Sequence, residues 1–342
     1  MTWMDEAAGY RMPAEWESHE RTIMGFPSHV AQWGERLHHG QLAWAEVART
    51  IADFEPVSML ARPADAGLAA DICAHSNIEI VEMDLDDAWL RDTGPLFGVN
   101  TDRTQRIGFD PVFNVWGNLY EARGFDDRIA SAWCAAHAES CVRVPFVLEG
   151  GGVAVDGDGT VFTTEQCLLH PNRNPELARV DIEANLRAIL GVDTVVWLPY
   201  SIDDRDTDGH IDLVLVPVQP GVVLFQGCDD VTDPEHARLA ISRRCLERTV
   251  DAQGRATEII DLPVLPYAEV FGERLPVPYG NLYVCNGAVI VPVTGHPADT
   301  DMLAVIASAF PSRRVVGVPG EVIAYGGGGP HCITQQVPAL RI

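Results

Sequence analysis

Four stretches of the chain repeat one order of polar and apolar positions: a polar or glycine-rich opening, a short β-rich run, a turn and a second β-rich run. They cover residues 92–110, 149–165, 210–227 and 281–295. The turns include D-G-D-G, Q-P-G and N-G, and the flanking residues are mostly Val, Ile, Leu and Phe. Each stretch is therefore predicted to form a β-hairpin, the first with the weakest signal.

Segments with apolar residues at three- and four-residue spacing lie between the hairpins and predict helices. They are Gln41–Phe54, Asp126–Ala138, Leu177–Leu190, Pro234–Thr249 and Asp299–Phe310. Asp233-Pro234 and Asn174-Pro175 are expected helix entries, and Gly191 is an expected C-cap. Hairpin openings at residues 92, 149, 212 and 281 are 57, 63 and 69 residues apart.

This spacing predicts a hairpin-and-helix unit repeated about five times, the first copy lying around Arg21–Pro27. Repeated β-rich units of this size favour radial packing, with the hairpin openings near a common axis. A doubly wound sheet is the alternative, because units of this length also suit βαβ folds. No linker or low-complexity segment divides the chain, so we expect one α/β domain over residues 1–342.

The amino-acid composition excludes several kinds of enzyme chemistry but says little about the fold. The 342 residues carry 24 basic and 49 acidic side chains, a net charge of -25, and every basic residue is arginine. Without lysine the chain cannot form a lysine Schiff base, so pyridoxal-phosphate enzymes and Schiff-base aldolases are excluded, as is a Walker phosphate loop. The surplus negative charge opposes nucleic acid and anionic membranes, although such a charge most often serves solubility alone.

The chain shows no targeting signal, and we expect a cytoplasmic protein. Its acidic start lacks the basic and then apolar order of a signal peptide, and no run approaches the roughly 20 apolar residues of a spanning helix. The cysteines occur singly and are expected to be thiols, most of them small buried apolar residues. They are Cys73, Cys134, Cys141, Cys167, Cys228, Cys245, Cys285 and Cys332.

If the hairpin openings meet at one axis, their polar residues meet there too. The candidates are Arg91 and Asp92 in WLRDTGP, Glu149 in LEGGG, Asp206, His210 and Asp212 in DTDGHID, and His331 and Cys332 in GGGGPHCITQQVP. Glycine lies beside nearly every one of them, where it lets backbone and ligand approach closely.

Several of these residues also have ordinary structural explanations. Asp92 before Thr-Gly-Pro could be a turn former or a cap. Glu149 follows the apolar run VPFVL and is expected to be buried and therefore paired. His210 and Asp212 have the period of a strand, so we expect both on one face of a central strand, where two ionisable groups are costly unless they serve a ligand.

Cys332 follows four glycines, Pro330 and His331. A cysteine is more often a buried apolar residue than a nucleophile, but the glycines offer access and backbone N–H groups that could lower the thiol pKa. His331 is expected to face away from Cys332 and to be a poor base for it. Zinc catalysis is disfavoured, because no C-x-x-C or H-E-x-x-H spacing is present.

Carboxylates around a thiol disfavour the thiolate unless a cation binds between them. A guanidinium fits such a site, because it is planar, permanently charged and donates N–H bonds in forks that carboxylates accept. The candidate residues therefore favour a small cationic guanidino substrate, whose charge would also stabilise the thiolate that attacks it.

Five motifs resemble the agmatine deiminase family, which is related to bacterial peptidylarginine deiminases within the guanidino-group-modifying superfamily. They are WLRDTGP, LEGGGVAVDGDGTVFTTEQCLLHPNRNP, DTDGHID, NLYVCNGAVIVP and GGGGPHCITQQVP. The opening GYRMPAEWESHERTIMGFP extends the resemblance to essentially the whole chain. It implies a five-bladed α/β propeller, the pentein fold, of pseudo-fivefold repeats, acting without a metal or redox cofactor.

The resemblance also implies roles for the candidate residues. Cys332 would be the nucleophile, His210 the general acid and base, and Asp92 and Asp212 the clamp on the guanidinium. Glu149 would help to hold the substrate and orient His210, and Asp206 resembles a position that helps to bind agmatine. The implied reaction is a hydrolysis through a thiouronium intermediate on Cys332, which gives N-carbamoylputrescine and ammonia, a step of putrescine and polyamine metabolism.

The chain departs from the family pattern at a few positions, and the substrate stays open at this point. Leu213 replaces the asparagine that commonly follows GHID, and Gly25-Phe26 replaces Ala-Trp, so the wall around the substrate tail could differ. The alternatives are deimination of arginine, a methylated arginine or a secondary-metabolite intermediate, amidine transfer to an amine, and cation binding without turnover. A homodimer is also left open.

Overall fold

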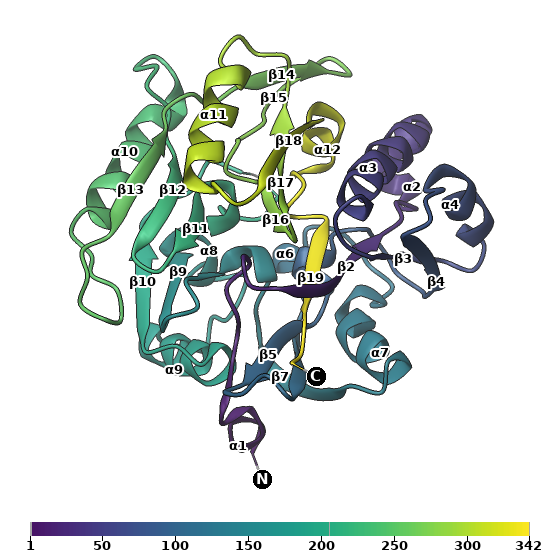
Figure 1. Cartoon of the computed structure of the whole chain (residues 1–342), viewed down its shortest axis with the longest axis horizontal. Helices are drawn as coiled ribbons and strands as arrows, with labels where there is room; N and C mark the ends of the chain where they lie inside the picture. Colours follow the sequence, from purple (N-terminus) through teal and green to yellow (C-terminus); the bar gives the residue numbers. More distant parts are fainter. Residues whose placement is uncertain (1, 205, 342) are drawn as a thin grey trace.

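Five small sheets surround the middle of the molecule in the computed structural model, which describes residues 2–204 and 206–341 (Figure 1). Each sheet contains an antiparallel pair of strands and, beside one strand of that pair, a parallel strand that the chain reaches through a helix. The molecule is thus a five-bladed α/β propeller. The predicted fold class is confirmed, and a doubly wound sheet is excluded.

The five blades have the strand orders β1-β5-β6-β7, β8-β9-β10, β11-β12-β13, β16-β17-β18 and β19-β2-β3-β4, and β14 and β15 form a separate hairpin. The strands are β1 Tyr10–Arg11, β2 His19–Gly25, β3 Val57–Ala61, β4 Ile78–Glu82, β5 Leu96–Asn100, β6 Arg106–Val112, β7 Ser140–Val147, β8 Ala154–Val155, β9 Thr160–Thr164, β10 Thr194–Leu198, β11 Leu215–Gln219, β12 Val222–Gln226, β13 Glu258–Leu262, β14 Tyr267–Val270, β15 Glu273–Pro276, β16 Tyr283–Cys285, β17 Ala288–Val293, β18 Arg314–Pro319 and β19 Thr334–Pro338.

Five helices connect the blades' strands as predicted, with ends that differ by a few residues: α3 Leu37–Ala52, α7 Ile129–Ala136, α9 Arg179–Leu190, α10 Pro234–Leu246 and α11 Asp299–Ala309. Shorter helices are α1 Trp3–Ala7, α2 Val30–Trp33, α4 Ala66–Ile72, α5 Leu90–Thr93, α6 Val115–Asn118, α8 Glu165–Leu168 and α12 Glu321–Gly326. Single 3₁₀ turns are η1 Gly34–Arg36, η2 Asp126–Arg128, η3 Gly150–Gly152 and η4 Ile211–Leu213.

All four predicted hairpins are confirmed, as β5–β6, β8–β9, β11–β12 and β16–β17. The first copy of the repeat is completed by the other end of the chain. Strand β2 pairs with the C-terminal strand β19, with Met24 opposite Thr334. The two ends of the sequence therefore close the ring in one blade, and this closure carries the segment before β19 to the axis.

Local signals at the helix ends are only partly confirmed. Gly191 ends α9 in the left-handed region at φ +62°, and Asp233 caps α10 by accepting from the Glu235 N–H at 2.9 Å. Asn174 does not open a helix, because its side chain bonds both backbone groups of Val147, at 2.9 Å each. Helix α9 consequently begins four residues beyond Pro175, at Arg179.

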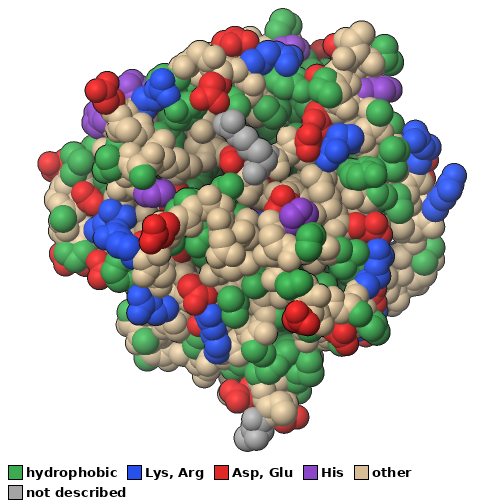
Figure 2. All heavy atoms as spheres, turned by 180° about the vertical axis from the view of Figure 1, so that it is seen from behind, with side chains coloured by type: hydrophobic (Ala, Val, Ile, Leu, Met, Phe, Trp, Pro, Cys, Tyr) green, Lys and Arg blue, Asp and Glu red, His purple; other side chains and the backbone are tan. Residues whose placement is uncertain are grey.

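The acidic charge lies largely at the surface. Figure 2 shows acidic and arginine side chains interspersed over one face of the molecule. Arginines such as Arg243 and Arg255 pair with carboxylates of other residues. Mixed pairs of this kind are typical of a solvated surface and do not by themselves indicate a partner. No helix in the described part of the chain is long and apolar enough to span a membrane.

Candidate active site

The loops that lead into the five blades bring polar side chains together in the interior. Each of the five lies shortly before the first strand of its antiparallel pair: Asp92 before β5, Glu149 before β8, Asp212 before β11, Asn281 before β16 and Cys332 before β19. None is more than 7% exposed. Burying a polar group without a partner destabilises the folded protein. We therefore expect these side chains to contact one another or a ligand.

His210 and Asp212 do not lie on a strand, so that prediction is wrong. Asp212 sits in the 3₁₀ turn η4, His210 is the residue just before this turn, and β11 begins only at Leu215. β11 is also an edge strand of its sheet rather than a central one. The two side chains still reach the same place, because the tight turn directs both toward Gly151.

Gly151 lies where three of the candidate side chains meet. A Cβ at this position would lie 2.5 Å from His210 Nδ1 and 3.0 Å from both Asp212 Oδ2 and Asp92 Oδ1. Its backbone N–H donates to Asp92 Oδ1 at 2.9 Å. The absence of a side chain at Gly151 therefore lets the imidazole and the two carboxylates share one space.

Cys332 is held by a residue that the sequence analysis did not select. The Asn281 amide nitrogen lies 3.2 Å from the Cys332 sulfur, and the amide oxygen lies 3.3 Å from it. Asp212 Oδ2 lies 3.4 Å from the same sulfur. The signal for Asn281 was present, because this residue opens the fourth predicted hairpin just as the other candidates open theirs.

The glycines before Cys332 make room for the thiol. A Cβ at Gly328 would lie 2.9 Å from the sulfur, and one at Gly329 would lie 2.6 Å from Asn281 Oδ1. The Gly329 N–H acts to lower the pKa of Cys332, as expected, but burial and the charges of Asp212 and Asp92 outweigh it. The pKa of the thiol is therefore raised well above its usual value, so these surroundings disfavour the thiolate.

Asp92 and Asp212 lie in one cluster but differ in their partners. Asp92 accepts from the Trp116 indole N–H at 2.9 Å and from Gly151, and burial followed by the Asp212 charge raises its pKa to about 7. Burial also acts to raise the pKa of Asp212, but the hydrogen bond and charge of His331 outweigh it and lower the pKa. The two carboxyl groups therefore titrate far apart.

His210 is almost fully buried, and neither ring nitrogen has a hydrogen-bond partner among the described residues. Asp92 Oδ1 lies 3.8 Å from its Nδ1. Burial lowers the pKa of His210, and the charges of Asp212 and Glu149 oppose that shift without cancelling it. An imidazole with unused nitrogens in such a place is suited to moving a proton.

Glu149 is fully buried and paired, as expected, and its partner is Arg173, whose Nε donates to Oε1 at 2.6 Å. The second oxygen of Glu149 has no partner among the described residues. Glu149, His210 and Cys167 offer one ligand atom each within 4.8 Å of one another, a grouping that could hold a metal ion. They do not fit one well, because Arg173 already supplies a cation and burial raises the pKa of the Cys167 thiol.

A cavity of about 460 Å³ opens onto Cys332 and Asp92. Its walls include Trp89, Trp116 and Asp206, and Asp206 also borders a second cavity next to it. Asp206 lies beside the glycine run, since a Cβ on Gly327 would lie 2.8 Å from its Oδ2. The cavity thus joins the buried thiol to a carboxylate farther out.

The two departures from the family pattern do not line this cavity. Phe26 is fully buried in an apolar cluster with Trp44 and Trp89, and Leu213 borders the second cavity instead. Phe26 could therefore alter the cavity wall only indirectly, through the apolar cluster to which Trp89 of that wall belongs.

The fold and the site together define the class of protein. A five-bladed α/β propeller with an acid-lined cavity, one imidazole and one thiol is the arrangement expected of the guanidino-group-modifying superfamily. The profile of the Porphyromonas-type peptidyl-arginine deiminase family matches residues 11–338. The chain belongs to this family.

Named relatives agree over the full length. The agmatine deiminase of Ectopseudomonas mendocina (strain ymp) is 40% identical, the match covering 99% of this chain and 98% of that protein. That of Stutzerimonas stutzeri (strain A1501) is 41% identical, over 97% and 96%. Among solved structures, the agmatine deiminase of Enterococcus faecalis superposes with a TM-score of 0.93 at 33% identity, covering 100% of this chain and 98% of that one. A substrate-bound variant of the C. jejuni enzyme gives 0.89 at 26% identity and 97% coverage of both.

Proposed function

We propose that this protein hydrolyses agmatine to N-carbamoylputrescine and ammonia through a covalent intermediate on Cys332. One observation carries the proposal: a buried thiol, two carboxylates and an imidazole lie together, and the thiol and one of these carboxylates line a cavity that reaches another carboxylate. Full-length similarity to agmatine deiminases supports the choice of substrate.

Asp92 and Asp212 are proposed to hold the guanidinium. Carboxylates accept guanidinium N–H groups in bidentate pairs, and Asp212 Oδ1 is buried without a partner among the described residues. The bound cation would lower the pKa values of Asp92 and Cys332, since it cancels the unfavourable burial of their negative forms. Substrate binding would therefore favour the ionised forms that burial and like charges disfavour.

The chemistry proceeds in two halves. The Cys332 sulfur attacks the guanidinium carbon, the thiol proton passes through His210 to the departing nitrogen, and ammonia leaves a thiouronium on Cys332. His210 then removes a proton from water, the oxygen bonds to the same carbon and the carbon–sulfur bond breaks. The products are the ureido compound and a restored thiol, with one proton released to the ammonia. Glu149, fixed by Arg173, orients His210 and the substrate in this scheme.

Asp206 is proposed to bind the amine at the far end of agmatine, because it borders the cavity beyond Cys332. Butylguanidine, which lacks that amine, provides a matched substrate. The change Asp206→Asn is expected to raise KM for agmatine by about tenfold, the loss of one charge-assisted contact, and to leave KM for butylguanidine unchanged. Equal effects on both substrates would remove Asp206 from this role.

Mass spectrometry of products from a panel of guanidino compounds tests the function itself. Ammonia and N-carbamoylputrescine from agmatine support it. Ureido products from arginine or methylarginine alone would change the substrate, and amidine transfer to an added amine would make the protein an amidinotransferase. Cys332→Ala should bind agmatine without turnover, and normal activity in that variant would refute the covalent step.

We further propose that residues 1–342 form one catalytic domain that acts in the cytoplasm. Pairing of β2 with β19 supports the first point, because it joins both ends of the chain in one blade. The eight free cysteines support the second. Sedimentation analysis would decide between a monomer and the homodimer that the sequence leaves open.

A further inference from the structure

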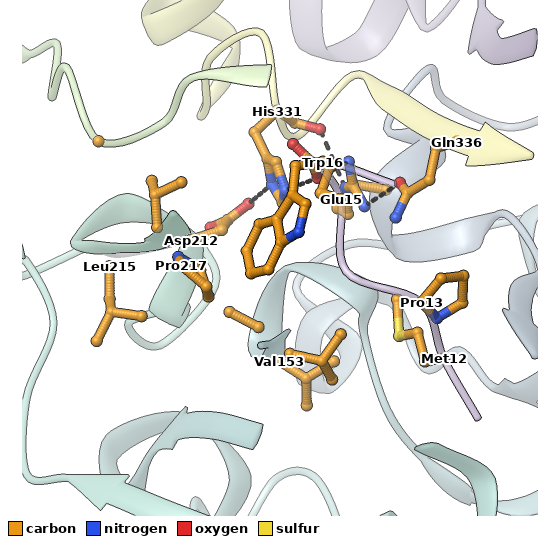
Figure 3. Close-up of a pocket in the computed structure, with 15 residues that line it drawn as sticks. Met12, Pro13, Glu15, Trp16, Val153, Asp212, Leu215, Pro217, His331 and Gln336 are labelled. Carbon is orange, nitrogen blue, oxygen red and sulfur yellow. Dashed lines mark hydrogen bonds and ion pairs between the residues drawn. The ribbon is translucent and has the colours of Figure 1, made fainter. Parts of the chain in front are cut away.

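A second group of ionisable side chains lies next to Asp212, around a different cavity from the one that reaches Cys332. Figure 3 shows it: Glu15 and Trp16, from the N-terminal segment, approach His331, which in turn approaches Asp212. The cavity there measures about 40 Å³, enough for a few water molecules and too small for a substrate. The roles proposed above use neither Glu15 nor His331.

His331 lies between two carboxylates. Its Nδ1 is 2.8 Å from Asp212 Oδ2, and its Nε2 is 2.9 Å from Glu15 Oε2. A carboxylate accepts hydrogen bonds only, and a neutral imidazole has one N–H to donate. Both contacts are hydrogen bonds only if His331 carries two protons, so the geometry favours an imidazolium.

Glu15 is itself firmly held in its position. Arg91 Nη2 donates to Glu15 Oε2 at 3.0 Å, and the Val284 N–H donates to Oε1 at 2.8 Å. Arg91 also donates to Gln336 at 2.7 Å, which fixes the guanidinium. Two other segments of the chain therefore fix the direction in which Glu15 presents its negative charge to His331.

We propose that His331 and Glu15 act as a positioning pair, in which a permanent imidazolium holds Asp212 ionised and aimed at the substrate guanidinium. The pair rests on the proposed function, since it specifies how one arm of the guanidinium clamp is prepared. His331 takes one oxygen of Asp212, and the other oxygen stays free for the substrate. Among the described residues, no cation donates a hydrogen bond to Asp92, whose two donors are a neutral indole and a backbone N–H.

The direction of the pKa shifts agrees with this geometry. Burial and the Arg91 charge act to lower the pKa of His331, but the charge of Glu15 and the bonds to Asp212 and Glu15 raise it overall. Burial acts to raise the pKa of Glu15, and His331 and Arg91 instead bring it down to about 2. The charged groups that bear on this pair are Arg91, Asp212 and Arg313, with Asp92, His210 and Cys332 on the far side of Asp212.

The first test needs no substrate, and its decisive measurement is made on the wild-type protein. Long-range ¹H–¹⁵N spectra of the wild-type protein should show both ring nitrogens of His331 protonated at pH 7.5, where an ordinary histidine is neutral. The spectrum of His331→Asn assigns the signal by its loss. A neutral His331 at pH 7.5 would overturn the proposal.

The second test is kinetic and uses Glu15→Gln. Loss of the Glu15 charge should make His331 neutral and raise the pKa of Asp212, so kcat/KM for agmatine should fall on the acidic side of its pH profile. The fall should be about tenfold for each unit by which that pKa rises, measured at a pH where Asp212 is protonated. The value of kcat/KM should recover toward that of the wild type as the pH rises and Asp212 ionises again. A loss that does not depend on pH, or no loss, would refute the positioning role.

Glu17→Gln is the matched control. Glu17 belongs to the same N-terminal segment and bonds Arg11 and Arg103, away from His331. Its removal should leave both the His331 signals and the shape of the pH profile unchanged. If no guanidino compound were turned over by the wild-type protein, the proposed function would fail, while the protonation of His331 would still be decided by the spectra.

Discussion

The amide nitrogen of Asn281 lies 3.2 Å from the sulfur of Cys332, although the two residues are 51 positions apart in the chain. They lie at the openings of two different blades, β16 and β19. Asp212, from a third blade, reaches the same sulfur at 3.4 Å. The thiol therefore has an amide donor on one side and a carboxylate on the other, and the balance between these two neighbours affects when the thiolate forms.

Replacing Asn281 should disfavour the Cys332 thiolate, and the size of the effect should depend on the new side chain. Asn281→Ala removes the amide donor and is expected to lower kcat by about 10²-fold, the usual effect of losing one donor to a developing or stored negative charge. Asn281→Asp has nearly the same shape but adds a carboxylate, so it should lower kcat further by raising the thiol pKa. Steady-state kinetics with agmatine measures both effects.

Asn286→Ala is the control for this pair of variants. Asn286 lies in the β16–β17 turn of the same blade and bonds the backbone of His19 on both sides of its amide. Its loss should cost stability and leave kcat nearly unchanged. An Asn281→Asp variant as active as Asn281→Ala would show that the charge beside the sulfur does not control the reaction.

Asn281 also shows which features of the site the sequence predicts and which it does not. The alternation of β-rich runs and turns identified four hairpins and their openings, because local turn chemistry and side-chain period determine those features. It also placed Asn281 at one opening. Its contact with Cys332 depends on how the ring closes, through the pairing of β2 with β19, and no local pattern reports that pairing.

The strand assignment for His210 and Asp212 failed for a different reason. Two-residue spacing is compatible with a strand, but the tight turn η4 also brings both side chains to one side. Glu15 and Arg173 lie within motifs of the family resemblance, but no local pattern singled them out, since their importance comes from partners that lie 316 and 24 positions away. Charged side chains that complete a buried network of hydrogen bonds can be identified only once the fold is known.

Gly151 offers a sharp test of the packing at the centre of the site. Gly151→Ala would place a methyl group 2.5 Å from His210 Nδ1 and 3.0 Å from both aspartates, so the imidazole and carboxylates must move apart. A misplacement of about 1 Å among reacting groups costs about 10²-fold in rate, which is the expected loss in kcat/KM.

Gly152→Ala is the neighbouring control. A Cβ there has its nearest neighbour at 3.7 Å, an ordinary contact, so activity should stay within a factor of about three, less than 1 kcal/mol. Thermal melting of both variants separates loss of the site from loss of the fold. Similar activity in the two variants would contradict the crowding around Gly151.

The pKa of Asp92, raised to about 7, gives the reaction a specific pH dependence. Below pH 7 the free protein holds Asp92 protonated and offers the guanidinium one carboxylate instead of two, so kcat/KM should fall as the pH drops. The bound cation lowers the pKa of Asp92, so the fall in kcat should begin at a lower pH than the fall in kcat/KM.

Proton release gives an independent measurement of the same event. Agmatine binding to Cys332→Ala at pH 6.5 should release a proton from Asp92, which calorimetry detects as a heat that varies with the ionisation enthalpy of the buffer. The Ala variant removes the thiol as a second source of protons. Heats that are the same in every buffer would show that Asp92 is already ionised before the substrate arrives.

The reactivity of Cys332 toward two small reagents tests whether a cation activates it. Burial and the charges of Asp212 and Asp92 raise the pKa of the thiol, so a neutral alkylating agent should meet an unreactive thiol at pH 7. 2-Chloroacetamide and 2-chloroacetamidine have nearly the same shape, but the amidine carries a positive charge that can bind between the two carboxylates. This charge should lower the thiol pKa, and the amidine should alkylate Cys332 faster by about 10²-fold, the equivalent of two pKa units. The rates are divided by those of a free small thiol in solution, which removes the intrinsic difference between the reagents. Agmatine should protect Cys332 from the amidine, and a corrected ratio near one would show that the carboxylates do not link cation binding to thiolate formation.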